Sequence, residues 1–249
     1  MIKAPNDNAV VSRLFSWYES NKRHMPWRDI NDPYKIWLSE IILQQTRIEQ
    51  GLPYYLKFVQ KYPTIKHLSE AHIDEVLRLW QGLGYYSRAR NLHKCAKTVS
   101  KDFGGHFPSD RKVLMKLPGI GPYTSAAIAS FAFGKQEAVV DGNVMRVITR
   151  LYGITEDITN QKTFKKISEI VSELIPSNKP DIFNQAIMEF GAVHCVPASP
   201  NCNQCIFNDF CITRAKGWQK RIPVKTKAIK KRIRYLNYLI VEINGRLLM

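Results

Sequence analysis

Four cysteines near the end of the sequence have the spacing of a metal site. Cys195, Cys202, Cys205 and Cys211 follow the pattern C-x6-C-x2-C-x5-C, within seventeen residues. Zinc and a [4Fe–4S] cluster both accept four cysteine ligands. Zinc sites usually contain two C-x2-C pairs and this pattern has one, so the spacing alone leaves the metal open. The fifth cysteine, Cys95, is expected to be a core thiol.

Two carboxylates stand where acid–base chemistry is possible. Glu40 lies in the apolar stretch 37–46, so its carboxyl is expected to be partly buried. Burial raises a carboxyl pKa and favours the protonated form that a general acid needs at neutral pH. Asp141 follows the apolar residues 138–140 and precedes a helical pattern. The residues alone allow two readings of Asp141, a helix N-cap or a catalytic carboxylate.

A turn with two glycines separates two helical patterns. The stretch 117–121 reads Leu-Pro-Gly-Ile-Gly, and its glycines are Gly119 and Gly121. Such a turn lets another backbone approach closely, and amides at the start of the next helix attract anions. The pattern resembles the helix-hairpin-helix, a motif that grips the DNA backbone without regard to sequence; a plain turn between helices is the alternative.

Charge and composition bound the class of protein. The 249 residues include 37 Lys and Arg against 21 Asp and Glu, a net charge of +16, and 45% are hydrophobic. A folded chain with this excess favours a polyanionic partner, either nucleic acid or an anionic membrane. Nine basic residues and no acidic ones lie in residues 216–234. This stretch is either a solvated linker or a linker that also touches phosphates.

The start of the sequence has no apolar stretch of the kind found in a secretory signal, and no run approaches eighteen apolar residues. We therefore expect no membrane partner and a monomer in the cytosol of a bacterium, or in the nucleus or mitochondrion of a eukaryote. Disulfides are a poor interpretation of the cysteines in such a reducing compartment.

The elements that must position these residues are predicted to be mostly helical. A helical region over 37–55 is expected to be interrupted near Gly51-Leu52-Pro53, and residues 235–243 with the turn Asn244-Gly245 indicate the start of a β-hairpin. The other predicted helices cover residues 9–22, 73–80, 88–103, 110–117, 123–133, 143–152, 163–174 and 181–190.

In combination these features resemble the helix-hairpin-helix DNA glycosylases, and among them the MutY-type adenine DNA glycosylases. The resemblance covers roughly residues 9–215. It rests on the glycine hairpin, the four cysteines and five further motifs: Pro26-Trp27-Arg28, residues 37–46, residues 82–92, residues 140–144 and Phe183-Asn184-Gln185-Ala186.

The resemblance implies an all-α fold with two lobes. A six-helix barrel lobe with the hairpin would cover residues 30–135. Residues 1–29 and 136–215 would form a second lobe that carries a [4Fe–4S] cluster on the four cysteines. Residues 216–234 would be a basic linker, and residues 235–249 the beginning of a truncated NUDIX-like domain.

The resemblance also implies a reaction in the cleft between the lobes. Adenine paired with 8-oxoguanine or guanine in duplex DNA would be flipped out and excised. Glu40 would protonate the adenine, Asp141 would stabilise the cationic sugar, and Asn143 would orient Asp141 or the water. Tyr123 stands where bifunctional relatives have a lysine, so a monofunctional enzyme is expected, since tyrosine forms no Schiff base.

Further residues match positions around the DNA base in this family. Gln45 and Tyr85 would enter the base stack, and Arg88 and Arg90 would either contact phosphate or form structural ion pairs. The positions near the flipped adenine are Trp27, Arg28, Leu43, Ile48 and Gln185, of which Arg28 and Gln185 could hydrogen bond to its edge.

Two alternatives remain from the sequence. One is a related mismatch glycosylase specific for thymine, with which Tyr123 is equally compatible. The other is a non-catalytic DNA-binding module with a structural metal site, against which the presence of both Glu40 and Asp141 argues.

Overall fold

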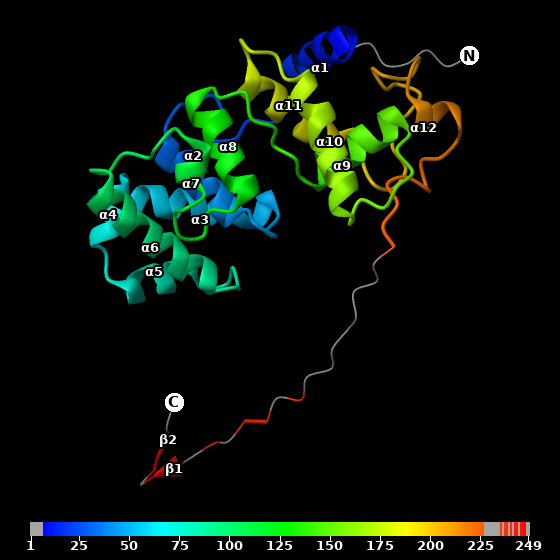
Figure 1. Cartoon of the computed structure of the whole chain (residues 1–249). Coiled ribbons are helices and arrows are strands. Elements are labelled where there is room, and N and C mark those ends of the chain that lie inside the picture. The colour runs from blue at the N-terminus through cyan, green and yellow to red at the C-terminus, as the bar shows by residue number, and fades with distance from the viewer. Residues whose placement is uncertain are drawn as a thin grey trace.

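The computed structural model describes residues 7–226, 235, 237–238, 240, 242–243 and 245–247, and it is built almost entirely from helices (Figure 1). The predicted all-α class is confirmed. The helices are α1 (Asp7–Asn21), α2 (Pro33–Ile42), α3 (Ile48–Lys61), α4 (Ile65–Glu70), α5 (Ile73–Trp80), α6 (Ser87–Asp102), α7 (Arg111–Leu114), α8 (Pro122–Phe133), α9 (Gly142–Tyr152), α10 (Gln161–Leu174), α11 (Pro180–Val193) and α12 (Ile212–Ala215).

One hydrophobic core lies among helices α2 to α8. Trp37, Phe58 and Trp80 are fully buried at its centre, and the ring of Phe58 meets that of Trp80 edge to face at 5.9 Å. These helices are contiguous in sequence, so this core closes largely on itself. Figure 1 shows them as one group, separate from the group formed by α9 and α10.

A second core brings the N-terminal helix against the C-terminal half. Leu14 of α1 packs among α9, α10 and α11 with Phe183 and Phe190, although about 160 residues separate α1 from α11 along the chain. The chain must therefore pass from α1 through the whole first core and return. A small apolar seam of Ala126, Ala127 and Val139 lies where α8 leads back toward α9.

The interruption predicted at Gly51-Leu52-Pro53 is wrong. Helix α2 starts at Pro33, where proline is tolerated because the first turn needs no amide donor, and Asp32 caps it. The break comes instead at residues 43–47, and Pro53 lies inside α3. Gln45, in the turn that follows α2, has a left-handed backbone with φ of 54°. Residues 43–47 contain no glycine or proline that would predict this break.

Arg88 holds the end of α2. Its guanidinium donates to the carbonyls of Ile41, Ile42 and Gln44 at 2.6–3.2 Å, and to that of Leu83. These are the carbonyls that a helix end leaves without a partner. Arg88 therefore has a structural role, made through backbone carbonyls and not through the ion pair considered from the sequence. Arg90 is exposed.

The C-terminal hairpin contains β1 (Glu242–Ile243) and β2 (Arg246–Leu247), which pair antiparallel with Ile243 opposite Arg246. Residues 227–234 of the predicted basic linker, and residues 236, 239, 241, 244 and 248–249 of the predicted NUDIX-like beginning, lie outside the described residues. Within the part of the chain that is described, no helix is long and apolar enough to cross a membrane.

The start of α9 lies directly against α11 at Gly191. A Cβ on Gly191 would lie 2.7 Å from the Cβ of Asn143 and 2.9 Å from the Asn143 carbonyl oxygen. Only glycine lets the two backbones come this close. Gly191 therefore sets the position of the α9 N-terminus, where Asp141 is the capping residue.

Replacing Gly191 by alanine tests this contact. Alanine forms helices better than glycine, yet we expect Gly191→Ala to lower the free energy of unfolding by about 1–3 kcal/mol, because the backbone contact cannot absorb a methyl group. The matched control is Gly142→Ala, since nothing lies within 4 Å of a Cβ at Gly142. Urea unfolding of both variants checks this, and equal stabilities would contradict it.

Candidate active site

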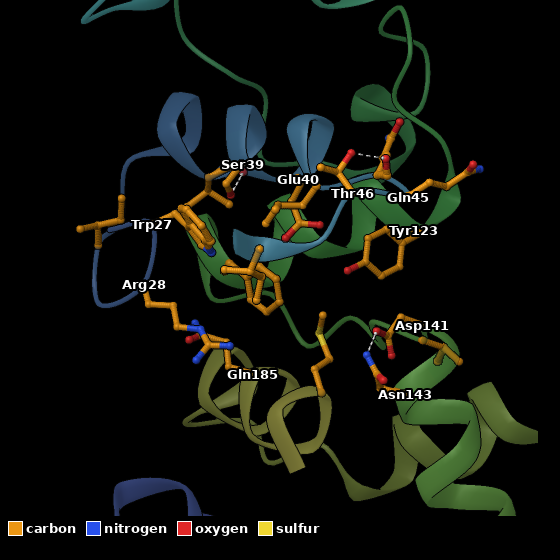
Figure 2. A pocket seen from close by; sticks show the side chains of 18 residues that line it. Trp27, Arg28, Ser39, Glu40, Gln45, Thr46, Tyr123, Asp141, Asn143 and Gln185 are labelled. Atoms are coloured by element: carbon orange, nitrogen blue, oxygen red, sulfur yellow. Dashed lines mark hydrogen bonds between the residues drawn. The ribbon is translucent and has the colours of Figure 1, made fainter. Parts of the chain in front are cut away.

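A cavity of about 620 Å³ opens between the two cores. Its volume lies within the range of pockets that take a small molecule, about 300–1,000 Å³. Figure 2 shows Glu40 and Tyr123 on one side and Asp141 and Asn143 across from them. Of the residues predicted from the sequence, those on the cavity are Trp27, Arg28, Glu40, Leu43, Gln45, Ile48, Tyr123, Asp141, Asn143 and Gln185.

Glu40 comes from the last turn of α2, is partly buried as expected, and lines the cavity. The pKa of Glu40 is raised from an ordinary value of 4.5 to about 7, chiefly by burial and in smaller part by the charge of Asp141. A hydrogen bond with Tyr123 and the charge of Arg28 act in the opposite direction. Near pH 7 this carboxyl is therefore partly protonated and can deliver a proton.

Tyr123 lies in the first turn of α8, beside Glu40. Burial and the charges of Glu40 and Asp141 raise the pKa of Tyr123 well above its ordinary value. Its hydroxyl stays neutral at physiological pH, so it can only supply a hydrogen bond.

Asp141 combines the two readings that the sequence left open for it. It is the N-cap of α9, with Oδ1 accepting from the Val144 amide at 2.8 Å, and it also lines the cavity. Its Oδ2 accepts from Asn143 Nδ2 at 2.7 Å (Figure 2). Burial raises the pKa of Asp141 despite these hydrogen bonds. The cap holds the carboxylate in one orientation at the cavity wall.

Asn143 is itself held by Arg146. Arg146 Nη2 donates to Asn143 Oδ1 at 2.8 Å and to the Gly191 carbonyl at 2.7 Å, and its Nε donates to the Cys195 carbonyl at 2.8 Å. This buried guanidinium joins the α9 N-terminus to the loop of the cysteines.

The two polar side chains predicted to meet a base edge have protein partners. Arg28 Nη2 donates to Glu189 Oε2 at 2.7 Å, and Gln185 Oε1 accepts from the Tyr18 hydroxyl at 2.9 Å. Both also line the cavity. Each therefore has hydrogen-bonding groups left over for a ligand but a fixed orientation.

Tyr85 lies away from the cavity and is 69% exposed. Like Gln45, it has a left-handed backbone, with φ of 48°. A large aromatic ring in that conformation is costly and uncommon away from functional sites. The prediction that Gln45 and Tyr85 enter a base stack stays a prediction, and both residues stand at points of backbone strain.

The glycine hairpin has the predicted position between α7 and α8. Gly119 has φ of 76°, and a Cβ there would meet Asn91 Cβ at 2.9 Å, so both conformation and space require glycine. Gly121 is the N-cap of α8 and offers no side chain to cap it. No side chain caps the first turn of α8, whose free amides begin at Tyr123 because Pro122 has none.

The four cysteines line one small cavity together, after α11 and before α12. Among the residues described, no group of three or more His, Cys, Asp or Glu side chains is gathered as a site for a metal ion. Three of the sulfurs accept hydrogen bonds: Cys195 from Arg150 at 3.5 Å, Cys202 from Gln219 at 3.8 Å, and Cys205 from the Phe207 amide at 3.4 Å.

Arg150 holds the cysteine loop through hydrogen bonds to backbone carbonyls. This buried residue donates to the carbonyls of Val196, Pro197, Gln219 and Ile222 at 2.7–3.0 Å. Sequence reasoning had not singled out Arg150, Arg146 or Glu189. Their one sequence signal is charge at positions of α9 and α11 that otherwise follow an apolar helical pattern.

Comparison with protein families matches residues 38–173 to the HhH-GPD superfamily of base excision DNA repair proteins. The match covers more than half of the chain, and the chain belongs to this family. A protein of Buchnera aphidicola subsp. Baizongia pistaciae named adenine DNA glycosylase is 38% identical over 239 residues, which cover 92% of this chain and 68% of that protein.

Other relatives agree with this assignment. The human adenine DNA glycosylase is 41% identical over 223 residues, which cover 86% of this chain and 41% of the human protein. A solved thermostable thymine-DNA glycosylase has a TM-score of 0.78 and 33% identity, over 84% of this chain and 97% of that one. Endonuclease III, solved with DNA, is 24% identical with a TM-score of 0.71, over 87% of this chain and 100% of that one, and shares the fold.

The raised pKa of Glu40 makes stability depend on pH. A carboxyl whose pKa is raised on folding contributes stability that is fully present below the unfolded value and is lost as pH rises through about 7. We therefore expect Glu40→Gln to be as stable as the parent at pH 4.5 and more stable at pH 8. Urea unfolding across this range measures the difference.

Glu75→Gln is the control for this experiment. Glu75 is exposed, and the hydrogen bond from Lys61 lowers its pKa, so its contribution is already constant above pH 5. A difference for Glu40→Gln that stays flat between pH 4.5 and 8 would contradict the shifted pKa.

Proposed function

We propose that this chain is a monofunctional adenine DNA glycosylase that flips adenine out of A:8-oxoguanine or A:G mispairs in duplex DNA and excises it. The observation that carries the proposal is the pair of carboxylates in one cavity: Glu40 keeps a proton near neutral pH, while Asp141 is held by its cap and by Asn143. The names of the relatives support adenine as the base.

The two carboxylates divide the work of breaking the bond between adenine and deoxyribose. Glu40 gives its proton to the adenine ring, so the bonding electrons leave on a neutral base. The sugar becomes an oxocarbenium-like cation, which the Asp141 carboxylate stabilises. Water then adds to the anomeric carbon and gives up a proton to the Glu40 carboxylate, which restores the acid and leaves an abasic site. Asn143 holds the Asp141 carboxylate toward that carbon.

Tyr123 accounts for the proposed lack of strand cleavage. A bifunctional enzyme needs an amine that forms a Schiff base with the sugar, and the phenol of Tyr123 cannot do so. No lysine lies among the described residues that line the cavity. The role left for Tyr123 is to hydrogen bond to Glu40 and orient its carboxyl.

Binding of duplex DNA fits the charge and the exposed strained residues. The net charge of +16 favours phosphate contacts, and the first amides of α8 after Gly121 are placed to meet one. We assign the base stack to Gln45 and Tyr85. The flipped base would then lie against Trp27, Leu43 and Ile48.

The cysteine cavity fits a [4Fe–4S] cluster better than a zinc ion. A single ion draws four sulfurs to one point, whereas in the cluster each cysteine binds a different iron around a larger core. The four thiols surround one cavity without gathering on one ion site, and three of them accept N–H hydrogen bonds of the kind that support thiolate ligands. When bound, the cluster would fix the loop between α11 and α12.

A thymine-specific mismatch glycosylase is the second candidate. The solved thymine-DNA glycosylase, at 33% identity and a TM-score of 0.78, is the observation that favours it. The base released is what separates the two functions.

Release of free base from defined duplexes tests the proposal. We expect adenine from A:8-oxoguanine and A:G duplexes and no thymine from T:G. Glu40→Gln should slow adenine release under single-turnover conditions by about 10²–10⁴-fold, the usual contribution of a general acid. Thymine release, or full activity of Glu40→Gln, would overturn the assignment.

The same samples report strand cleavage. The DNA strand should stay intact until alkali or heat is applied, and borohydride should trap no stoichiometric protein–DNA adduct. Stoichiometric trapping would contradict the monofunctional mechanism.

Cys202→Ser tests the cluster. Losing one of four ligands should abolish the visible absorbance of the iron–sulfur centre and weaken DNA affinity, because the loop that it fixes loosens. The control is Cys95→Ser, at a buried cysteine outside the loop, which should keep the absorbance. An unchanged spectrum and unchanged affinity for Cys202→Ser would count against a structural cluster.

A further inference from the structure

Glu189 is a buried carboxylate just behind the wall of the cavity. Its side chain is 1% exposed, and it lies on α11 one turn after Gln185, which lines the cavity. A buried charge is tolerated only when it is paired and hydrogen bonded. The partners of Glu189 therefore indicate its role.

Two arginines from the segment between α1 and α2 satisfy Glu189. Its Oε1 accepts from the Arg23 amide at 3.2 Å and from Arg23 Nε at 2.6 Å. Its Oε2 accepts from Arg23 Nη2 at 2.9 Å and from Arg28 Nη2 at 2.7 Å. Burial alone would raise the pKa of Glu189, but these hydrogen bonds outweigh it and hold the pKa at about 2. The carboxylate is charged at any working pH.

The two arginines differ in whether they line the cavity. Arg28 is the single basic side chain among the described residues that line the cavity, whereas Arg23 does not line it. Arg28 is fixed by Glu189 and by the Arg23 carbonyl, which accepts from its Nη1 at 3.0 Å. The remaining N–H groups of its guanidinium are free of protein partners in the described part of the chain.

Opposite charges stand close by in the same cavity. Glu40 is faced by Arg28, by Tyr123 on α8 and by Asp141 at the start of α9, and the charge of Arg28 already acts on it. A guanidinium released from Glu189 would have these carboxylates as its next partners. An ion pair with Arg28 would favour the charged form of Glu40, which is the form that cannot give a proton.

We propose that Glu189 is a positioning residue for base recognition: it holds Arg28 as a hydrogen-bond donor toward the flipped base and keeps that cation from pairing with Glu40. The inference rests on the proposed function. Glu189 touches neither the base nor the reacting atoms, and it acts through Arg28. It also ties the α1–α2 segment to α11, so the two sides of the cavity keep one geometry.

Two measurements separate positioning from simple loss of stability. In Glu189→Gln the amide cannot pair with both arginines. We therefore expect the KM for an A:G duplex to rise by about 10–100-fold, and the single-turnover rate of adenine excision at pH 7 to fall by about as much. The high-pH limb of the rate should move to lower pH, because the freed Arg28 lowers the pKa of Glu40. Glu189→Asp, which keeps the charge, should restore part of both.

Arg23→Met is the matched control. It removes the two side-chain hydrogen bonds that Arg23 makes to the same carboxylate, keeps the backbone carbonyl that holds Arg28, and leaves the cavity lining unchanged. It should lower Tm about as much as Glu189→Gln while KM and the pH profile stay those of the parent. In an Arg28→Met background, Glu189→Gln should have no further effect on either.

The outcomes are distinct. If Arg23→Met and Glu189→Gln change KM and the pH profile equally, or if Glu189→Gln still acts in the Arg28→Met background, Glu189 is only structural and the inference fails. If the parent releases thymine and not adenine, the proposed function fails, and the double variant still reports whether Glu189 works through Arg28.

Discussion

The close contact between α9 and α11 is the constraint on which the rest of the site depends. At Gly191 the two helices approach until a single Cβ would collide with the backbone of Asn143. Arg146 lies along this contact and donates to Asn143, to the Gly191 carbonyl and to the Cys195 carbonyl. One buried guanidinium therefore fixes the side chain beside Asp141 and also the first residue of the cysteine loop.

Buried and half-buried arginines join segments that are distant in sequence. Arg88 ends α2, Arg150 gathers the cysteine loop, and Arg23 and Arg28 bind the α1–α2 segment to Glu189. Guanidinium suits this task because its planar donors meet several carbonyls or a carboxylate at once. Part of the large positive charge thus belongs to arginines that bind other parts of the protein. The rest is surface charge of the sort that attracts a polyanion.

Glu40 and Glu189 are in different protonation states near neutral pH because their surroundings differ. Glu40 is partly buried at the cavity and keeps a proton near neutral pH, whereas Glu189, whose side chain is 1% exposed, is held ionised by two arginines. The arginine partners keep Glu189 charged, because hydrogen bonds to a charged carboxylate offset the loss of water. The apolar stretch around Glu40 predicts its raised pKa, whereas the apolar neighbours of Glu189 give no sign of the two arginines that lower its pKa.

Much of the helical architecture could be read from the sequence, since apolar periodicity and the glycines after α8 and α9 mark most elements. Helices α4 and α12 were not predicted, and the break in the stretch 37–55 was predicted at the wrong place. The stretch 37–55 contains Gly51 and Pro53, yet the chain breaks earlier, at a left-handed Gln45 and not at either of them. Pro53 can stay inside α3 because a helix can give up one hydrogen bond when packing on the first core compensates it. Helix propensity depends only on the local sequence and does not include the energy of this packing.

The sequence by itself determined the all-α class, ten of the residues that line the cavity and the loop in which the four cysteines lie, because each follows from a local pattern or from a motif that resembles the family. Only the tertiary structure decided how these residues act together. It made Asp141 both a cap and a cavity carboxylate, occupied Arg28 and Gln185 with Glu189 and Tyr18, and turned Arg88 into the cap of α2. The reason is physical: hydrogen-bond partners of buried polar groups come from segments far away in the chain, and only the folded packing brings them into contact.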